Sequence, residues 1–124
     1  MLATAKLQAI IWTSRMDEAK RFYGEILGLP MKGESHGAAI FDVGGCDLRV
    51  SPVPSTTATE HTVLGFEVSD VNATATSLAA IGVRFERFPK FSHDEHGVLR
   101  TPDGAKVAWF RDPDGNLLSI VQYA

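Results

Sequence analysis

The sequence predicts an α+β fold in which two copies of a strand–helix–three-strand module form a cupped sheet of mixed or antiparallel strands. Three observations predict this fold. Two amphipathic helical segments each follow a run of strand character, each is followed by a hairpin pattern, and the two halves match at a nearly constant offset. With 124 residues the chain has room for one domain and little room for two independently cored ones.

The first half opens with a predicted strand over residues 6–13 and a predicted helix over residues 14–28. Apolar residues in the second segment recur at steps of three and four, which is the period of one helix face. Ser14 followed three residues later by Asp17 predicts a capping box at the start of this helix. Gly28 predicts its end, because glycine readily adopts the left-handed conformation that closes a helix.

A hairpin pattern follows in the first half. Residues 38–43 and 46–50 are apolar runs, and Gly44 and Gly45 between them can supply the positive φ angles of a two-residue turn. The stretch at 52–60 is rich in proline, serine and threonine and has no periodicity. We interpret it as the linker between the two halves.

The second half repeats this order. A strand is predicted over residues 62–68 and a helix over residues 70–82, with Ser69 or Asp70 as its N-cap and Gly82 at its end. The apolar face of this helix is weaker because the segment is rich in alanine and threonine, so we expect shallow burial.

Two hairpins are predicted after the second helix. A short one runs over residues 98–101 and turns at residues 102–104. A longer one joins residues 105–111 to residues 117–122 through the sequence Asp-Pro-Asp-Gly-Asn at 112–116, in which each residue type favours a turn. We interpret the carboxylates of that turn as structural.

The repeat defines the domain organisation. Ser14 and Ser69 occupy equivalent places at an offset of 55 residues. We predict one domain over the whole chain, with a first module at about residues 5–54, a linker at about 52–60 and a second module at about 61–124.

Composition excludes several classes of protein. Hydrophobic residues make up 44% and charged residues 22%, as in ordinary globular domains. The net charge is -3 and the twelve Lys and Arg are scattered, so we expect no nucleic-acid partner. Cys46 is the single cysteine, and the apolar run at residues 9–12 is too short for a signal peptide or a membrane span. We expect a cytoplasmic protein with no membrane partner.

Three motifs resemble those of one family. They are MDEAKRFYGEILGLP at residues 16–30, GFEVSDVNATATSLAAIGV at residues 65–83 and VAWFRDPDGNLLSIVQ at residues 107–122. In this order they are similar to the vicinal oxygen chelate superfamily, which groups glyoxalase I, extradiol dioxygenases, fosfomycin-resistance enzymes and bleomycin-resistance proteins. The resemblance covers nearly the whole chain and implies the glyoxalase/bleomycin-resistance-like fold of two βαβββ modules. It also implies a homodimer.

The resemblance places metal ligands, where a member has them, on the first and last strands of the modules. The corresponding positions here are Gln8, Arg49, Val63 and Ser119, where a metal-dependent member would show mostly His and Glu. Val63 has no donor atom, Arg49 is a cation, and only Gln8 could act as a weak ligand. We therefore expect no metal site and no cofactor.

Strand alternation, counted from those positions, assigns residues to the inner face of the cup. The lining would suit a flat or aromatic small molecule, with Arg49 and Glu67 fixing its orientation. A pairing of Arg49 with Glu67 is a further hypothesis, because a buried cation needs a partner. The predicted ligand pocket comprises Gln8, Ile10, Trp12, Phe41, Arg49, Val63, Glu67, Trp109 and Ser119, and the same count adds Ala39, Ser51 and Gly65 to that face.

Three functional hypotheses follow. The first is a metal-independent binder of a small aromatic or amphipathic molecule, similar to the drug-sequestering branch of the family. The second is a glyoxalase I-like lyase or isomerase, with a metal relocated to His93, Glu95 or His96, or with metal-free acid–base chemistry by Glu67. In this second hypothesis, Glu95 or His96 would reach over the cup as a general base. The third is an interaction module without a ligand of its own.

Overall fold

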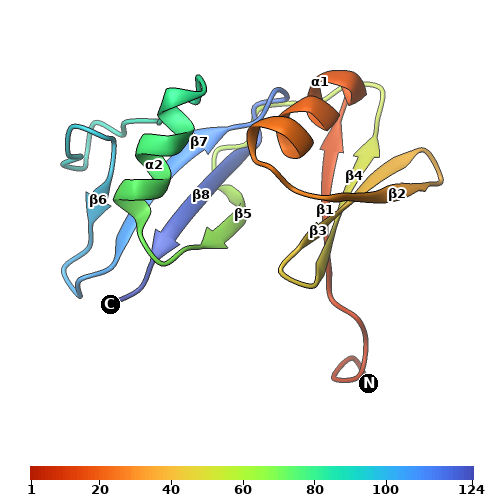
Figure 1. The fold of residues 1–124 in the computed structure, drawn as a ribbon, viewed down its shortest axis with the longest axis horizontal. Coiled ribbons are helices and arrows are strands. Elements are labelled where there is room, and N and C mark those ends of the chain that lie inside the picture. The colour runs from red at the N-terminus through yellow and green to blue at the C-terminus, as the bar shows by residue number, and fades with distance from the viewer. The chain divides into compact units, whose positions relative to one another are not determined.

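A computed structural model describes all residues, 1–124, and divides them into two compact units, Met1–Thr56 and Thr57–Ala124. Each unit contains a four-stranded mixed sheet and one helical segment, in the order strand, helix, three strands (Figure 1). The predicted α+β fold of two repeated modules is confirmed. Neither helix has the length and apolar character that crossing a bilayer requires.

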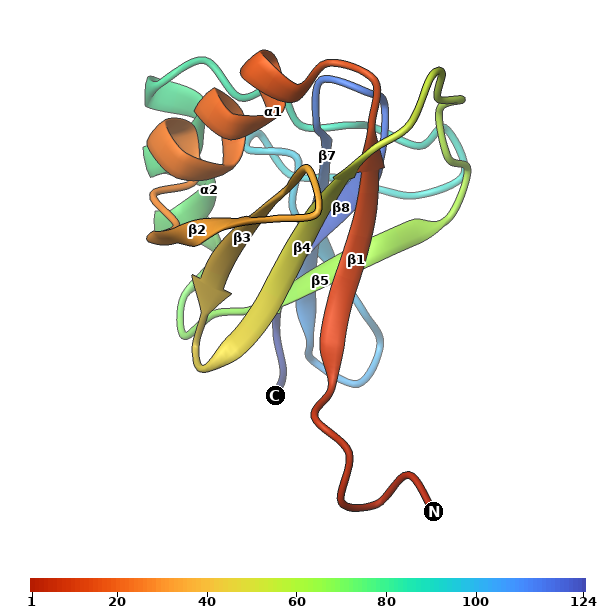
Figure 2. The ribbon, with the colours of Figure 1, turned by 90° about the vertical axis from the view of Figure 1, so that its right-hand side faces the viewer.

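The first unit has its strands in the order β1-β4-β3-β2, with β1 parallel to β4 and the other neighbours antiparallel (Figure 2). One face of this sheet packs against the helical segment. Tyr23 is fully buried there, and its ring centroid lies 6.2 Å from that of Phe41. The elements are β1 (Gln8–Thr13), α1 (Met16–Arg21), a π-helical turn (Phe22–Ile26), β2 (Met31–Ser35), β3 (Ala38–Val43) and β4 (Cys46–Pro52).

The capping box predicted for the first helix is wrong. Arg15 is the N-cap residue and makes no side-chain capping hydrogen bond. The hydroxyl of Ser14 instead lies 3.1 Å from that of Thr56, and the Arg15 N–H donates to the hydroxyl of Thr13 at the end of β1. The Ser14 hydroxyl therefore interacts with a residue distant in sequence and does not cap the helix, and local spacing does not reveal this interaction. The predicted end is correct, because Gly28 has a φ of 72°.

One strand had no residue range assigned from the sequence. β2 is needed to complete three strands after the helix, yet four of its five residues are exposed, and its pairing with β3 is interrupted by a bulge at Lys32, between Met31 and Gly33. An exposed edge strand of this kind lacks the alternating apolar pattern on which strand prediction depends.

The second unit has its strands in the order β5-β8-β7-β6, with β5 parallel to β8. The helix α2 packs on β7 and β8 and buries Val71 and Ala75 against the sheet. Asp70, one of the two residues predicted for this position, is its N-cap and accepts a hydrogen bond from the Ala73 N–H at 3.0 Å. The elements are β5 (Thr62–Glu67), α2 (Val71–Ala80), β6 (Leu99–Arg100), β7 (Lys106–Arg111) and β8 (Leu117–Gln122).

Candidate functional site

The sheet of the second unit has a hollow of about 570 Å³ on the face opposite α2. Strand register explains its shape. Gly65, Ser119 and Trp109 lie side by side across β5, β8 and β7, and a Cβ on Gly65 would lie only 3.2 Å from the Ser119 hydroxyl oxygen. The missing side chain therefore keeps the floor open. The residues lining this concave hollow are Thr62, Gly65, Glu67, Thr101, Asp103, Ala105, Val107, Trp109, Ser119, Val121 and Tyr123.

Trp109 forms a fixed aromatic wall of the concave hollow. Its indole N–H donates to the hydroxyl of Thr62 at 3.2 Å, which ties β7 to β5 through side chains. The ring of Phe88 meets it edge-on, with centroids 5.2 Å apart, and the His93 ring lies at 6.3 Å. A ring held on these sides loses little conformational freedom when a flat molecule packs against it.

The charges of the concave hollow are acidic. Glu67 and Asp103 are its only ionisable side chains apart from the phenol of Tyr123, and no Lys, Arg or His lines it. The hydroxyl of Thr101 donates to the Asp103 carboxylate, and this bond, with one from the Ala105 N–H, lowers the pKa of Asp103 below its ordinary value. Asp103 is therefore an anion at neutral pH, and the hollow favours a positively charged guest.

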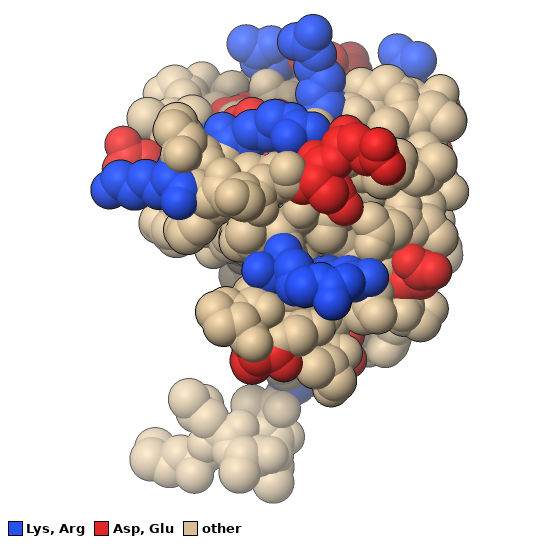
Figure 3. Space-filling view, turned by 90° about the vertical axis from the view of Figure 1, so that its left-hand side faces the viewer, with Lys and Arg blue, Asp and Glu red and all other residues tan.

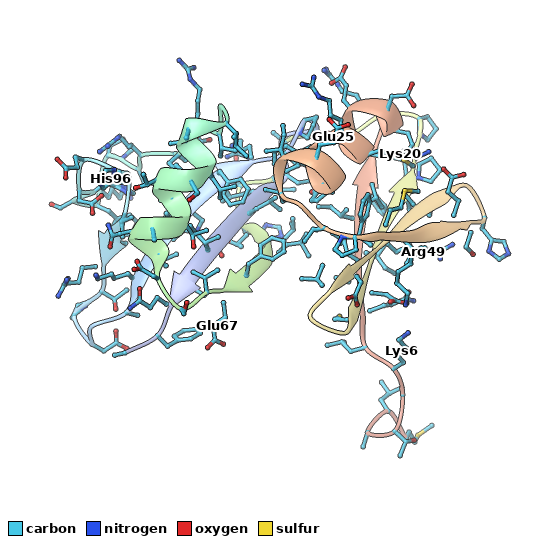
Figure 4. The ribbon with its side chains drawn as sticks, viewed as in Figure 1. Lys6, Lys20, Glu25, Arg49, Glu67 and His96 are labelled. Atoms are coloured by element: carbon cyan, nitrogen blue, oxygen red, sulfur yellow. The ribbon has the colours of Figure 1, made fainter.

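The first unit presents a second exposed sheet face. Ile10 lies opposite Arg49, and Trp12 lies opposite Ser51, so these residues and Gln8 share one face. Ile10 is 55% exposed and Trp12 is 63% exposed. The Arg49 guanidinium donates to the backbone oxygen of Ser35 at 2.7 Å, which gives this cation a partner on its own sheet (Figure 4). The pairing of Arg49 with Glu67 stays a prediction.

Phe41 and Ala39 were assigned to the wrong face. The two-residue turn pairs Val43 with Cys46, so Phe41 lies opposite Leu48 and not opposite Arg49. Phe41 is 1% exposed and Ala39 is fully buried, both on the helix side of the sheet. A count that kept one parity across the turn placed them in the cup, because it ignored how the turn sets register.

Val63 is displaced by a bulge. Thr62 pairs with Leu117 while Leu64 pairs with Leu118, which leaves Val63 as the extra residue between them. Thr62, and not Val63, lines the concave hollow and holds the indole of Trp109.

Sequence reasoning also missed Asp103, Val107, Val121 and Tyr123. Val107 and Val121 share the strand parity of Trp109 and Ser119, so extending that count would have found them. Asp103 stands in a turn, and its approach to the sheet face is not visible in local sequence.

The residues present do not fit the divalent metal that the resemblance implies. Val63 offers no donor, and Arg49 is a cation already bound to a carbonyl. Ser119 has Gly65 as its neighbour across the strands, so no second ligand stands beside it. No three His, Cys, Asp or Glu side chains gather anywhere in the chain in an arrangement that could hold a metal ion.

The segment His93-Asp94-Glu95-His96 is held by its own hydrogen bonds. The His93 Nε2 accepts from the Phe88 N–H at 3.0 Å, and its Nδ1 lies 2.9 Å from the Gly97 oxygen, to which it donates. Both ring nitrogens are therefore engaged within the chain and are not presented to a metal. This geometry gives no support to a metal relocated to this loop.

Glu95 and His96 do not reach over the concave hollow, contrary to the expectation for a general base. They line a different hollow, with Ala75 and Ala79 of α2, on the other side of the sheet. Figure 4 shows Glu67 at the end of β5 and His96 on the loop beside α2, well apart. The three candidate catalytic residues are therefore not brought together.

Asp94 gives the loop a testable pH dependence. Burial by itself would raise the pKa of Asp94, but hydrogen bonds from the Val98 N–H, the His96 N–H and the Asn72 amide together lower it below the ordinary value of 3.8. Because the folded pKa is depressed, the stabilisation is complete above that value and is lost as the pH falls through the lower folded value.

We expect the amide protons of His96 and Val98 to lose protection from hydrogen exchange as the pH falls below the ordinary value of 3.8, relative to intrinsic exchange at each pH. In Asp94→Asn, whose amide oxygen can still accept both N–H groups, this pH dependence should flatten. An unchanged dependence in the variant would show that another group controls the loop.

The comparisons with known proteins agree with the fold. A family model described as the Glyoxalase/Bleomycin resistance protein/Dioxygenase superfamily matches residues 6–120. No curated protein matches the chain.

Solved structures show the same fold at low sequence identity. A lactoylglutathione lyase from Agrobacterium tumefaciens is 21% identical, with a TM-score of 0.72 over 96% of this chain and 93% of that one. A glyoxalase family protein from Enterococcus faecalis is 22% identical, with a TM-score of 0.73 over 98% of this chain and 99% of the other. An integron cassette protein from the mobile metagenome of V. Cholerae is 19% identical, with a TM-score of 0.69 over 100% and 98%. At such identities the likeness is one of fold.

Proposed function

The chain belongs to the Glyoxalase/Bleomycin resistance protein/Dioxygenase superfamily, and from that premise we propose that it binds a small, flat, positively charged organic molecule without a metal. The observation that carries this proposal is the concave hollow of the second unit, which combines a fixed indole with two carboxylates and no cation. Fold alone does not choose among the activities of the family, so the argument depends on this lining.

The lining accounts for each part of such a ligand. The face of Trp109 would stack on an aromatic ring, while Val107 and Val121 would cover its apolar edge. Glu67 and Asp103 would attract a protonated amine, since a cation held near an indole and two carboxylates gains from both. The volume of about 570 Å³ is in the range of small-molecule sites.

The proposal departs from the sequence-based hypothesis in one respect. Arg49 and Glu67 were expected to orient the ligand together, whereas Arg49 is engaged with Ser35 and the acidic groups of the concave hollow need no cation from the chain. The guest itself would supply the positive charge.

Isothermal titration with 9-aminoacridine, a planar cation, tests the proposal, and acridine-9-carboxylate serves as the anion of similar shape. We expect saturable binding of the cation with one site per chain and at least tenfold weaker binding of the anion. Trp109→Leu should weaken binding about tenfold through lost stacking. Glu67→Gln should weaken it up to about fivefold, as expected for an exposed charge.

Matched controls are Trp12→Phe, which removes the other indole, and Glu60→Gln, which removes an exposed acid outside the concave hollow. Both should bind like the unaltered protein. Equal affinity for the two acridines, or no effect of Trp109→Leu, would overturn the proposal. Stoichiometric metal in protein purified without chelator, together with turnover of a hemithioacetal, would replace it with the lyase alternative.

A further inference from the structure

A separate hollow of about 320 Å³ lies between α2 and the segment that follows it, on the opposite side of the second unit's sheet from the concave hollow. We call it the outer hollow. Small side chains on α2 create it: Ala75 is 1% exposed and Ala79 is solvent-exposed, so two methyl groups stand where longer side chains would fill the space. Val83 and Phe85 complete an apolar floor.

The walls of the outer hollow are fixed by packing. The ring of Phe85 meets that of buried Phe110 edge-on, with centroids 5.7 Å apart. The loop opposite approaches closely, since a Cβ on Gly97 would lie 2.8 Å from the Cβ of Phe85. The Arg87 guanidinium bridges to this loop by donating to the Glu95 backbone oxygen at 3.1 Å. The outer hollow is thus preformed.

The rim of the outer hollow carries surplus positive charge. Arg84 and Arg87 both line it, and neither guanidinium forms an ion pair with a carboxylate. The Arg84 side chain also makes no hydrogen bond. Glu95 is the one acid present, but its side chain is 85% exposed and lies 3.5 Å from the His96 ring nitrogen. Figure 3 shows one side of the molecule, on which Lys and Arg side chains are interspersed with Asp and Glu side chains.

We propose that the outer hollow binds a small organic anion, with its carboxylate or phosphate between Arg84 and Arg87 and its apolar body on Ala79, Val83 and Phe85. Guanidinium groups that form no ion pair within the protein are the side chains best suited to such oxyanions, because their planar forks offer parallel N–H donors. Apolar surface beside them favours an aryl or short alkyl body over an inorganic ion. The site is independent of the concave hollow, which has the opposite charge.

The experiment follows the alanine and valine methyl resonances of the full-length protein during titration with phenyl phosphate, benzoate and, as a neutral compound of similar size, benzyl alcohol. We expect saturable shifts at Ala75, Ala79 and Val83 with the two anions, and at least tenfold weaker binding of the alcohol. The stronger of the two anions identifies the preferred head group.

Variants separate a built site from general surface charge. Arg84→Gln should weaken anion binding about fivefold or more, and Ala79→Leu should abolish it by filling the space while keeping a good helix former. Arg100→Gln removes the same charge from an exposed position outside the outer hollow and should change affinity less than twofold. An equal effect of Arg84→Gln and Arg100→Gln, equal binding of the alcohol, or binding that survives Ala79→Leu would overturn the proposal.

Discussion

Asp112→Ala is expected to destabilise the second unit by about 3 kcal/mol, the scale of losing hydrogen bonds to a buried charged group. Asp112 is only 6% exposed, and its carboxylate accepts hydrogen bonds from within its own turn. Two come from the Asp114 and Asn116 backbone N–H groups, both at 2.9 Å, and one from the Asn116 side-chain amide at 2.8 Å. Alanine would leave these donors buried without an acceptor.

Urea unfolding monitored by the fluorescence of Trp109 in a Trp12→Phe background measures this loss in the second unit. Asp103→Ala is the matched control, because Asp103 belongs to a comparable turn but is exposed, and it should have a much smaller effect. If Asp112→Ala and Asp103→Ala lowered the free energy of unfolding by similar amounts, burial of the Asp112 hydrogen bonds would not explain the effect. Because the Asp112 turn joins β7 to β8, the variant should also weaken ligand binding in the concave hollow that these strands line.

Gly115→Ala should destabilise the same turn by about 3 kcal/mol, combining left-handed backbone strain with overpacking. Gly115 has a φ of 83°, and a Cβ there would lie 2.8 Å from the Cβ and 3.1 Å from the Cα of Ala58. The segment around Ala58 cannot move away freely, because the Thr59 N–H donates to the Gly115 oxygen and Arg111 donates to the oxygens of both Thr59 and Gly115.

Gly82→Ala isolates the strain from the contact. Gly82 has a φ of 99° in the same unit, but nothing lies within 4 Å of its Cβ position. We expect it to lose about 1 to 2 kcal/mol in the same unfolding measurement, the backbone contribution alone. If Gly115→Ala and Gly82→Ala lowered the free energy of unfolding equally, the close contact with Ala58 would not contribute to the loss.

Much of the fold could be predicted because its determinants are local. The helix α2 has Asp70 as its N-cap and is followed by Gly82, and the hairpin at Gly44 and Gly45 has the positive φ angles that its sequence requires. In each case the residue type satisfies a backbone need at its own position. The capping box predicted at the start of α1 was wrong for the opposite reason. The hydroxyl of Ser14 lies near that of Thr56, which is distant in sequence within the same unit.

The candidate site was less predictable because the face of a strand depends on its partner. Trp109, Ser119, Gly65 and Glu67 do share one face, as strand alternation indicated. Phe41 does not share a face with Arg49, because the register set by the turn places it opposite Leu48. A period of two carries no information about which face is inside until the neighbouring strand is known.

By itself, the sequence determined that this protein is built from two similar modules, where most strands lie, where the helices end and which turns join them. Together with the family resemblance, it indicated that only Gln8 among the four strand positions associated with a metal could act as a weak ligand. Only the tertiary structure decided that, because of a bulge at Val63, Thr62 lines the concave hollow. It also decided that Asp103 and Glu67 both line this hollow, and that His96 and Arg84 line the outer hollow on the other side of the sheet. The physical reason is that backbone conformation and turn chemistry depend on neighbours in sequence, whereas the composition of a surface depends on register and packing between segments far apart in the chain.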